Sequence, residues 1–227
     1  MLADEKTVAG GVVTFLDVLG WKGVYDRIPE AIAKLRQLVE GIRDESLPLK
    51  RGRTYREIEV KSISDTIAIF TLCNIDEASN IIEIHGKLCQ WAIPQSIELE
   101  IPVRGATAFG EFEFSENIFV GKAVDEAASW HEHIDWIGVN LTPSAEFLYS
   151  PVKDLNLWRP YKAPNKSKID WTPRCVDWTA NWGQDREVRT RNIKDKFRRL
   201  GPIVPEISGK FIHTLAFIEK MGAPHDH

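Results

Sequence analysis

The sequence predicts an α+β fold in which strands and helices follow the order β-α-β-β-α-β, with a further strand and helices added at the C-terminal end. Three observations predict it. The 227 residues, 43% hydrophobic and 27% charged, suit one medium-sized globular domain with extensions, or two small ones. Apolar runs rich in β-branched residues alternate with segments whose apolar residues recur at helical spacing. Beyond residue 150, prolines and tryptophans accumulate and the composition changes.

The charge and the cysteine content exclude several classes of protein. There are 29 basic and 33 acidic residues, and this mild acidity argues against nonspecific nucleic-acid binding, although it leaves room for a local phosphate pocket. The three cysteines, Cys73, Cys89 and Cys175, match no zinc-binding spacing and favour a reducing compartment. No apolar run approaches the roughly 18 residues of a membrane span, and the charged start lacks a signal-peptide core. We therefore expect a cytoplasmic protein without a membrane or nucleic-acid partner.

The first strand and helix are predicted from residues 11–42. Residues 11–18 (GVVTFLDV) form a nearly continuous apolar run, which is typical of a central strand covered on both faces. Gly20 breaks this run. Across residues 29–42 the apolar side chains recur at helical spacing, so we expect a helix with Pro29 in its first turn.

A hairpin, a second helix and a long strand complete the predicted core. Residues 58–70 (IEVKSISDTIAIF) predict two short strands joined at a Ser-Asp turn. Asp76 opens a helix that we expect Pro94 to end. Residues 101–114 predict a strand with two glycines, which either weaken it or make room for a close neighbour. This order is that of a ferredoxin-like core, here followed by a helix at 123–130, a strand at 136–141 and a short helix.

The remaining residues predict an extension rich in tryptophan. Residues 151–227 hold half of the eight tryptophans, namely Trp158, Trp171, Trp178 and Trp182. Two helices are expected there, at 186–199 and 211–221. Because so much apolar surface is costly to leave in water, we expect residues 151–227 to pack on the domain formed by residues 1–150 or on a partner subunit.

Two aspartates lie where an apolar core disfavours them. Asp17 sits in the most hydrophobic strand, and Asp65 sits at the hairpin turn. A desolvated carboxylate needs a partner or a cation, and the first and third strands of a ferredoxin-like sheet are neighbours. Both carboxylates can therefore hold two divalent cations roughly 3.5–4 Å apart, and Gly20 lets backbone amides approach a phosphate. The simpler interpretations are a turn residue for Asp65 and a solvated or lysine-paired carboxylate for Asp17.

These motifs resemble those of the class III nucleotidyl cyclases. Residues 15–21 (FLDVLGW) resemble the family's Phe-x-Asp-Ile-x-Gly-Phe motif, and residues 62–65 (SISD) resemble its Thr-Ile-Gly-Asp hairpin, with Ser64 in place of glycine. The family's closing run is matched in order by residues 103–105 (VRG), 109–111 (FGE), 120–121 (VG) and 124–129 (VDEAAS). The resemblance covers about residues 11–140.

The resemblance implies an activity and a site. These enzymes convert a nucleoside triphosphate to a 3′,5′-cyclic monophosphate and pyrophosphate at sites shared between two chains, which implies a homodimer with composite sites. Asp17 and Asp65 would hold two Mn²⁺ or Mg²⁺ ions, with the Val18 carbonyl as a further ligand. The metals would lower the pKa of the ribose 3′-hydroxyl and neutralise the leaving pyrophosphate. Phe15 and Gly20 would flank the triphosphate.

The chain departs from the family at two positions on the third helix. The asparagine that orients the ribose falls at Asp125, and the arginine that stabilises the transition state falls at Ser129. Asp125 then takes another role or hydrogen-bonds the ribose. Arg104 is the first candidate for the missing positive charge. The next candidates are three residues of a basic loop, Lys50, Arg51 and Arg53. The simpler interpretation of that loop is a solvated turn.

The base-selecting positions also depart from the purine cyclases. Lys61 occupies one of them, and Ile118 occupies the partner position, where it cannot complete a purine-reading pair. Tyr55 would fill the space of a purine's second ring, or is an ordinary strand-edge aromatic. With the Trp-rich extension, this pattern resembles the bacterial pyrimidine cyclases of anti-phage defence (Pycsar), which make cyclic UMP or cyclic CMP for a separate effector protein. Donation from Lys61 and Arg104 to the uracil carbonyl oxygens favours UTP.

The sequence thus predicts a homodimeric, metal-dependent uridylate cyclase. The alternatives are a cytidylate cyclase, a purine cyclase, which Lys61 favours and Ile118 opposes, and a catalytically silent nucleotide-binding or dimerisation module, which Asp125 favours. The pair His131 and His133 is expected at the surface rather than at a metal, because residues two apart on a helix point in different directions.

Overall fold

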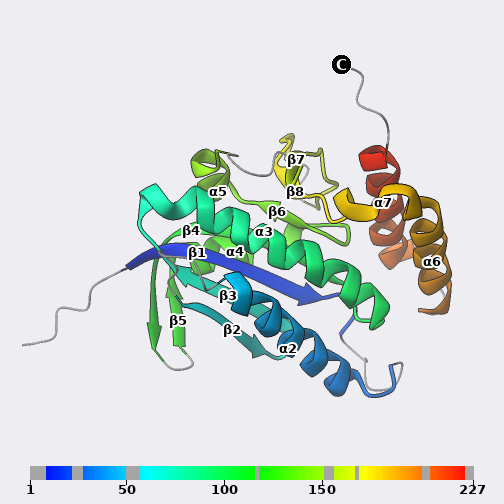
Figure 1. Ribbon diagram of the computed structural model, residues 1–227, viewed down its shortest axis with the longest axis horizontal. Helices are drawn as coiled ribbons and strands as arrows, with labels where there is room; N and C mark the ends of the chain where they lie inside the picture. Colours follow the sequence, from blue (N-terminus) through cyan, green and yellow to red (C-terminus); the bar gives the residue numbers. More distant parts are fainter. Residues whose placement is uncertain are drawn as a thin grey trace, which may run out of the picture.

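A mixed eight-stranded sheet forms the centre of the computed structural model, which describes residues 9–21, 28–49, 57–115, 118–150, 156–166, 169–200 and 205–222 (Figure 1). The strand order is β2-β3-β1-β4-β6-β8-β7, and β5 pairs with β4. The strands are β1 (Ala9–Val18), β2 (Ile58–Ile63), β3 (Thr66–Leu72), β4 (Val103–Ser115), β5 (Ile118–Gly121), β6 (Val139–Leu141), β7 (Trp158–Pro160) and β8 (Arg174–Val176). The helices are α2 (Ala31–Leu49), α3 (Ile75–Glu98), α4 (Lys122–His133), α5 (Pro143–Leu148), η1 (Ala180–Asp185), α6 (Arg186–Arg199) and α7 (Pro205–Gly222).

The predicted βαββαβ core is confirmed. Strand β1 lies between β3 and β4, which is the central position that its apolar sequence predicts. It is antiparallel to both neighbours. Strands β2 and β3 form the predicted hairpin. In β4, Gly105 makes room for a close neighbour, because a Cβ there would lie 2.2 Å from the backbone oxygen of Phe15 in β1.

Different helices pack against the two faces of the sheet. Val12 and Leu16 of β1 belong to the large buried cluster that includes residues of α2 and α3, the two helices on the near face in Figure 1. Val13 points to the other face and packs with Ala123 and Ala127 of α4. Side chains therefore alternate between two apolar environments along β1, which explains why the strand carries no polar face.

A buried histidine joins α3 to the sheet. His85 lies between the hydroxyls of Thr14 and Thr71, at 2.9 Å from Nδ1 and 3.0 Å from Nε2. Burial lowers the pKa of His85 from 6.5 to about 3. The imidazole is therefore neutral at pH 7 and serves to hold β1 and β3 against the helix.

Several predicted boundaries are wrong. Helix α3 continues through Pro94 to Glu98, because its last turn is held by tertiary contacts: Ile97 is buried and Ser96 Oγ accepts a hydrogen bond from the Val103 amide at 3.2 Å. Pro29 lies in the turn that precedes α2 instead of in its first turn. The strand expected at 136–141 is limited to β6.

The Trp-rich segment extends the central sheet. Strand β8 pairs with β6, and β7 pairs with β8. The indole of Trp158 is buried and donates to the Ile82 carbonyl of α3 at 3.1 Å. Gly86 makes this contact possible, because a Cβ on Gly86 would lie 2.4 Å from Trp158 Nε1. The division of the chain near residue 150 stays a prediction.

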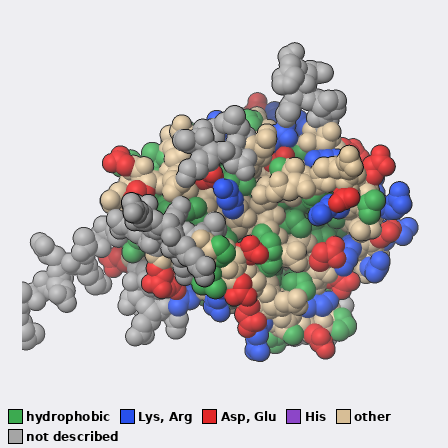
Figure 2. Space-filling model, in the orientation of Figure 1, with side chains coloured by type: hydrophobic (Ala, Val, Ile, Leu, Met, Phe, Trp, Pro, Cys, Tyr) green, Lys and Arg blue, Asp and Glu red, His purple; other side chains and the backbone are tan. Residues whose placement is uncertain are grey.

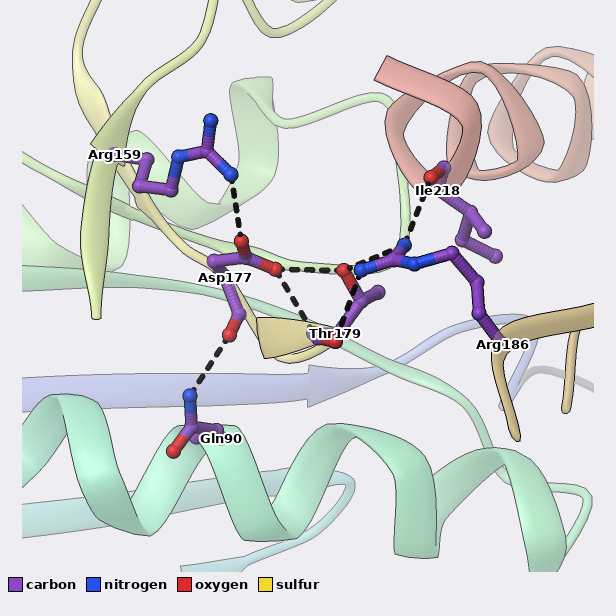
Figure 3. Close-up of polar contacts among 6 residues, drawn as sticks. All are labelled: Gln90, Arg159, Asp177, Thr179, Arg186 and Ile218. Carbon is purple, nitrogen blue, oxygen red and sulfur yellow. Dashed lines mark hydrogen bonds and ion pairs between the residues drawn. The ribbon is translucent and has the colours of Figure 1, made fainter. Parts of the chain in front are cut away.

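A buried polar network connects the extension to the core (Figure 3). Asp177, 2% exposed, accepts hydrogen bonds from Thr179 through Oδ1 and from Arg159 through Oδ2. Arg186 donates to Thr179 and to a main-chain carbonyl of α7. Gln90 of α3 donates to the Asp177 carbonyl at 2.8 Å. Because every charge has a partner, the network stabilises the packing of α6 and α7.

Within the ranges given above, no helix combines the length and apolar character needed to cross a membrane.

Candidate active site

Asp17 and Asp65 lie at the same end of the sheet. Asp17 is next to the last residue of β1 and pairs in register with Thr66 of β3. Asp65 occupies the turn just before that residue, and its carbonyl accepts a hydrogen bond from the Val18 amide at 3.0 Å. The antiparallel pairing of β1 and β3 therefore brings together the two carboxylates that were predicted from the sequence.

The turn that carries Asp65 is strained at Ser64. Its φ of +57° lies in the left-handed region, which costs a residue other than glycine about 1–2 kcal/mol. The cyclase hairpin that this turn resembles has glycine there. The chain thus keeps the turn conformation although the residue that best suits it is absent.

Arg104 binds Asp17 directly. The two residues are opposite each other in the β1–β4 register, and Arg104 Nε and Nη2 both donate to Asp17 Oδ2 at 3.1 Å. The third nitrogen, Nη1, donates to the carbonyls of Glu132 and Ile134 at the end of α4. The Asp17 carboxylate is therefore paired, as the simpler interpretation of the sequence proposed, but with an arginine. Its guanidinium ties β1 to the C-terminal end of α4.

The environment of Asp17 opposes its ionisation. Burial raises the pKa of Asp17 above 3.8, and the charges of Arg104 and His131 offset only part of this effect. The nearby carboxylate of Asp65 raises the pKa of Asp17 further. A cation between the two carboxylates would relieve both costs, so the electrostatics favour a positively charged ligand here.

A cleft of about 410 Å³ opens beside Asp17, and one of its walls comes from the extension. Lys166 is held there by a backbone hydrogen bond from its amide to the His133 carbonyl at 2.9 Å. Burial, then the positive charges of Arg104 and Lys210, lower the pKa of Lys166 below 10.5. Among the described residues its ammonium forms no ion pair. The lining residues are Asp17, Arg104, His131, Glu132, His133 and Lys166.

His131 is not a surface residue, contrary to the sequence-based expectation. It is 9% exposed, makes an edge-to-face contact with Phe15 at 6.2 Å between ring centroids, and lines the cleft. His133 is exposed, so the two rings do point in different directions. The expectation failed for His131 because helix α4 lies against the sheet with its C-terminal turn over Phe15.

Phe15, Asp17 and Lys61 share one face of the sheet. Phe15 is opposite Ala68 in β3, and Ala68 is opposite Lys61 in β2, so these three side chains form one row across the sheet. Asp17, two residues beyond Phe15, lies on the same face in the next row, opposite Thr66. Lys61 forms an ion pair with Glu59 on the same face at 3.5 Å. Gly20, two residues beyond β1, has φ of +73°. Residues 22–27, whose backbone amides were also candidates for contact with a phosphate, lie outside the described ranges.

Other predicted site residues lie apart from the cleft or outside the description. Asp125 and Ser129 are exposed on α4, and neither contributes to the cleft as the described residues form it. Tyr55 and the predicted basic loop, Lys50, Arg51 and Arg53, fall outside the described residues. The side chain of Ile118 does as well.

The donor set fits a divalent metal of the Mg²⁺ or Mn²⁺ kind. The donors are carboxylate and carbonyl oxygens, which these ions prefer, and Asp17 keeps Oδ1 for a cation while Oδ2 is bound to Arg104. No group of three or more His, Cys, Asp or Glu side chains able to hold a metal occurs in the described part of the chain. The remaining ligands would have to be water or substrate phosphates, as is usual for Mg²⁺.

Comparisons with known proteins give the fold. No family model matches the chain, and no curated protein matches it. The guanylyl cyclase Cya2 aligns over 74% of this chain and 90% of its own length, with 9% identity and a TM-score of 0.46. The catalytic core of a rhodopsin-guanylyl cyclase with converted specificity, solved with ATPalphaS, aligns over 74% of this chain and 95% of its own length, with 15% identity and a TM-score of 0.50. The second alignment shows that the chain has the fold of a nucleotidyl cyclase catalytic core.

Proposed function

We propose that this chain is a metal-dependent nucleotidyl cyclase that converts UTP to 3′,5′-cyclic UMP and pyrophosphate. The observation that carries the proposal is the pair Asp17 and Asp65, two carboxylates at one end of a cyclase-type sheet, of which Asp17 is desolvated. Burial makes the ionised form of Asp17 costly, and bound cations would offset that cost.

Asp17, Asp65 and the Val18 carbonyl would hold two Mn²⁺ or Mg²⁺ ions. When bound, the ions lower the pKa of the ribose 3′-hydroxyl and offset the charge of the leaving pyrophosphate. Arg104 keeps Asp17 in place through two hydrogen bonds to Oδ2. Phe15 and Gly20 flank the triphosphate.

Ser129 stands where the family has the arginine that stabilises the transition state, so another residue must supply that positive charge. We assign this role to a residue of the cleft. Arg104 was the first candidate, but its three nitrogens already donate to Asp17 and to the end of α4. Lys166 lies in the same cleft without an ion pair among the described residues and supplies a cation to the triphosphate. Arg104 contributes its charge while it positions Asp17.

The active enzyme is proposed to be a homodimer with composite sites. Lys61 on the sheet face and the exposed Asp125 on α4 would reach the nucleotide bound by the other chain. An exposed apolar residue on this face, Ile63 at 57%, supports a covered interface.

The proposal also names the base of the substrate and the biological role of the product. Lys61 donates to a uracil carbonyl oxygen, and Tyr55 occupies the space of a purine's second ring. Arg104, the second donor expected from the sequence, is instead bound to Asp17 and to the end of α4. Cyclic UMP made in the cytoplasm would act as a second messenger in anti-phage defence, read by a separate effector protein. The alternative within this class is CTP with cyclic CMP as product.

Incubation of the purified protein with Mn²⁺ and each of ATP, GTP, CTP and UTP, followed by mass spectrometry, tests the proposal. The expected product is cyclic UMP, from a species that sediments as a dimer. Cyclic CMP or a cyclic purine nucleotide would reassign the base, and a fully active monomer would contradict the composite site.

One observation favours a second function, a catalytically silent nucleotide-binding module. Arg104 occupies Asp17 Oδ2, where it competes with a metal, and Asp125 and Ser129 lack the family's ribose and transition-state contacts. A silent module would form no cyclic product from any triphosphate. It would also gain little thermal stability from Mn²⁺ in the presence of UTP, whereas the cyclase would be stabilised by both ligands.

Replacement of Lys166 by methionine is expected to lower kcat/KM by about tenfold or more, because the substitution keeps the side-chain length and removes the charge from the cleft. Lys166→Arg should keep most of the activity. The matched control is Lys162→Met on the same segment, where the side chain is 65% exposed and pairs with Asp170. Steady-state kinetics of cyclic nucleotide formation give the result, and equal kcat/KM for both methionine variants would remove Lys166 from the site.

A further inference from the structure

A basic helix and an apolar helix form a groove away from the candidate active site. Helix α6 has seven basic and two acidic residues among 14, in a chain whose net charge is −4. Lys and Arg side chains accordingly gather at the right-hand edge of the molecule, where α6 lies (Figures 1 and 2). Helix α7 packs beside α6 through an edge-to-face contact of Phe197 and Phe211, with ring centroids 4.6 Å apart.

The groove, of about 580 Å³, has two unlike walls. On α6, Arg191, Lys194 and Arg198 follow the spacing i, i+3, i+7 and form an exposed row of cations. On α7, the spacing i, i+3, i+4, i+7 aligns the residues Ser208, Phe211, Ile212 and Leu215. Each row covers two helical turns, about 11 Å. The groove is therefore elongated, with charge along one side and apolar surface along the other.

The apolar wall combines recessed and projecting side chains. Phe197 and Phe211 are 3% and 9% exposed and form the floor, whereas Ile212 is 62% exposed. On the opposite wall, Arg191 and Lys194 form no ion pair within the described part of the chain, and Arg198 pairs with Asp195 of its own helix. The groove therefore presents an exposed isoleucine and an apolar floor beside cations without ion pairs, and one occupant can bury the apolar surface while it pairs the charges.

We propose that this α6–α7 groove docks an acidic amphipathic helix of a partner protein. The partner's apolar residues enter beside Ile212, and its carboxylates face Arg191, Lys194 and Arg198. The groove matches a helix because its two rows have helical spacing and run over the same length. A nucleic acid would leave the apolar wall uncovered, and a flat membrane surface would not reach the recessed floor formed by Phe197 and Phe211.

Binding of two labelled peptides to the full chain tests the proposal by fluorescence anisotropy. Both are helical peptides of about 18 residues with leucines at i, i+3, i+4, i+7, and they carry either glutamates or lysines along one flank. The glutamate peptide is expected to bind at least about tenfold more tightly than the lysine peptide. Ile212→Glu should weaken its binding by about tenfold or more, and Lys194→Glu should reverse the preference between the peptides.

The controls are Ile32→Glu and Arg36→Glu on α2, where Ile32 is 56% exposed and Arg36 is also exposed, so both test sites have a counterpart of the same type. These two control variants should bind the glutamate peptide as the unmodified chain does. The two control and two groove variants should all keep the melting temperature of the unmodified chain. Equal affinity for both peptides, or no effect of Ile212→Glu, overturns the proposal. So does Lys194-dependent binding to phosphatidylserine vesicles without binding of the glutamate peptide. The assay measures no catalysis, so its outcome is independent of the proposed cyclase activity.

Discussion

Asp17→Asn is expected to lower the rate of cyclic nucleotide formation by at least about a hundredfold while the fold is retained. The substitution keeps the shape of the side chain and removes the charge that would hold the metals. Because Asp65 belongs to the same site, Asp65→Asn should cause a loss of similar size, and the double variant should be little worse than either single one. Initial rates with Mn²⁺ and UTP give the result.

The stability of the Asp17→Asn variant separates a catalytic from a structural role. Burial raises the pKa of Asp17, so the ionised form is less favourable in the folded chain than in the unfolded chain. At pH 7 the variant should therefore unfold with a free energy at least as high as that of the unmodified chain. Any gain should vanish as the pH falls below the ordinary pKa of 3.8, where both side chains are neutral. Urea titrations at both pH values measure this.

The matched control is Asp44→Asn, an exposed aspartate on α2, which should keep full activity. If Asp17→Asn keeps more than a tenth of the activity, the carboxylate does not hold the metals. A large loss of stability at pH 7 would instead assign the Asp17–Arg104 pair to the structure of the sheet.

Asp177→Ala is expected to lower the free energy of unfolding by about 3–5 kcal/mol, because it removes the buried carboxylate that accepts hydrogen bonds from Arg159 and Thr179. The network in Figure 3 connects β7, the segment that follows β8, α3, α6 and α7, so its loss should loosen the extension as a unit. Denaturant unfolding measures the change. Protease sensitivity of residues beyond 150 should rise in parallel.

An exposed ion pair provides the comparison for Asp177. Asp170 pairs with Lys162, but the two side chains are 85% and 65% exposed. Asp170→Ala should therefore cause a change in stability too small to resolve. If both alanine variants behave alike, the buried network does not hold the extension in place.

Much of the fold was predictable because local patterns decided it. The apolar run of β1, the Ser64-Asp65 turn and the charged sequence of α6 all folded as their residues indicated. Pro94 misled the prediction, because the contacts of Ile97 and Ser96 with the sheet outweigh the local cost of proline in a helix. Strands β7 and β8 were not located, because three-residue strands have no periodic signal of their own.

Some residues of the candidate site were likewise predictable from the sequence, and others were not. Asp17 and Asp65 stood out in the sequence because charged residues are rare in apolar strands and because their motifs resemble cyclase motifs. The pairing of Arg104 with Asp17 depends on the β1–β4 register, which no local pattern specifies. Lys166 lies about 150 residues from Asp17 in a segment marked by prolines, tryptophans and charges but by no catalytic motif, so nothing in the sequence linked the two.

The sequence by itself determined the core topology and the identity of the two carboxylates, because hydrophobic periodicity and the cost of a desolvated charge act over a few residues. Only the tertiary structure decided what surrounds them. His131 is buried because α4 lies over Phe15, and Trp158 reaches α3 because Gly86 has no side chain. Such contacts join residues far apart in the chain, and their free energies depend on the complementary shapes of folded elements.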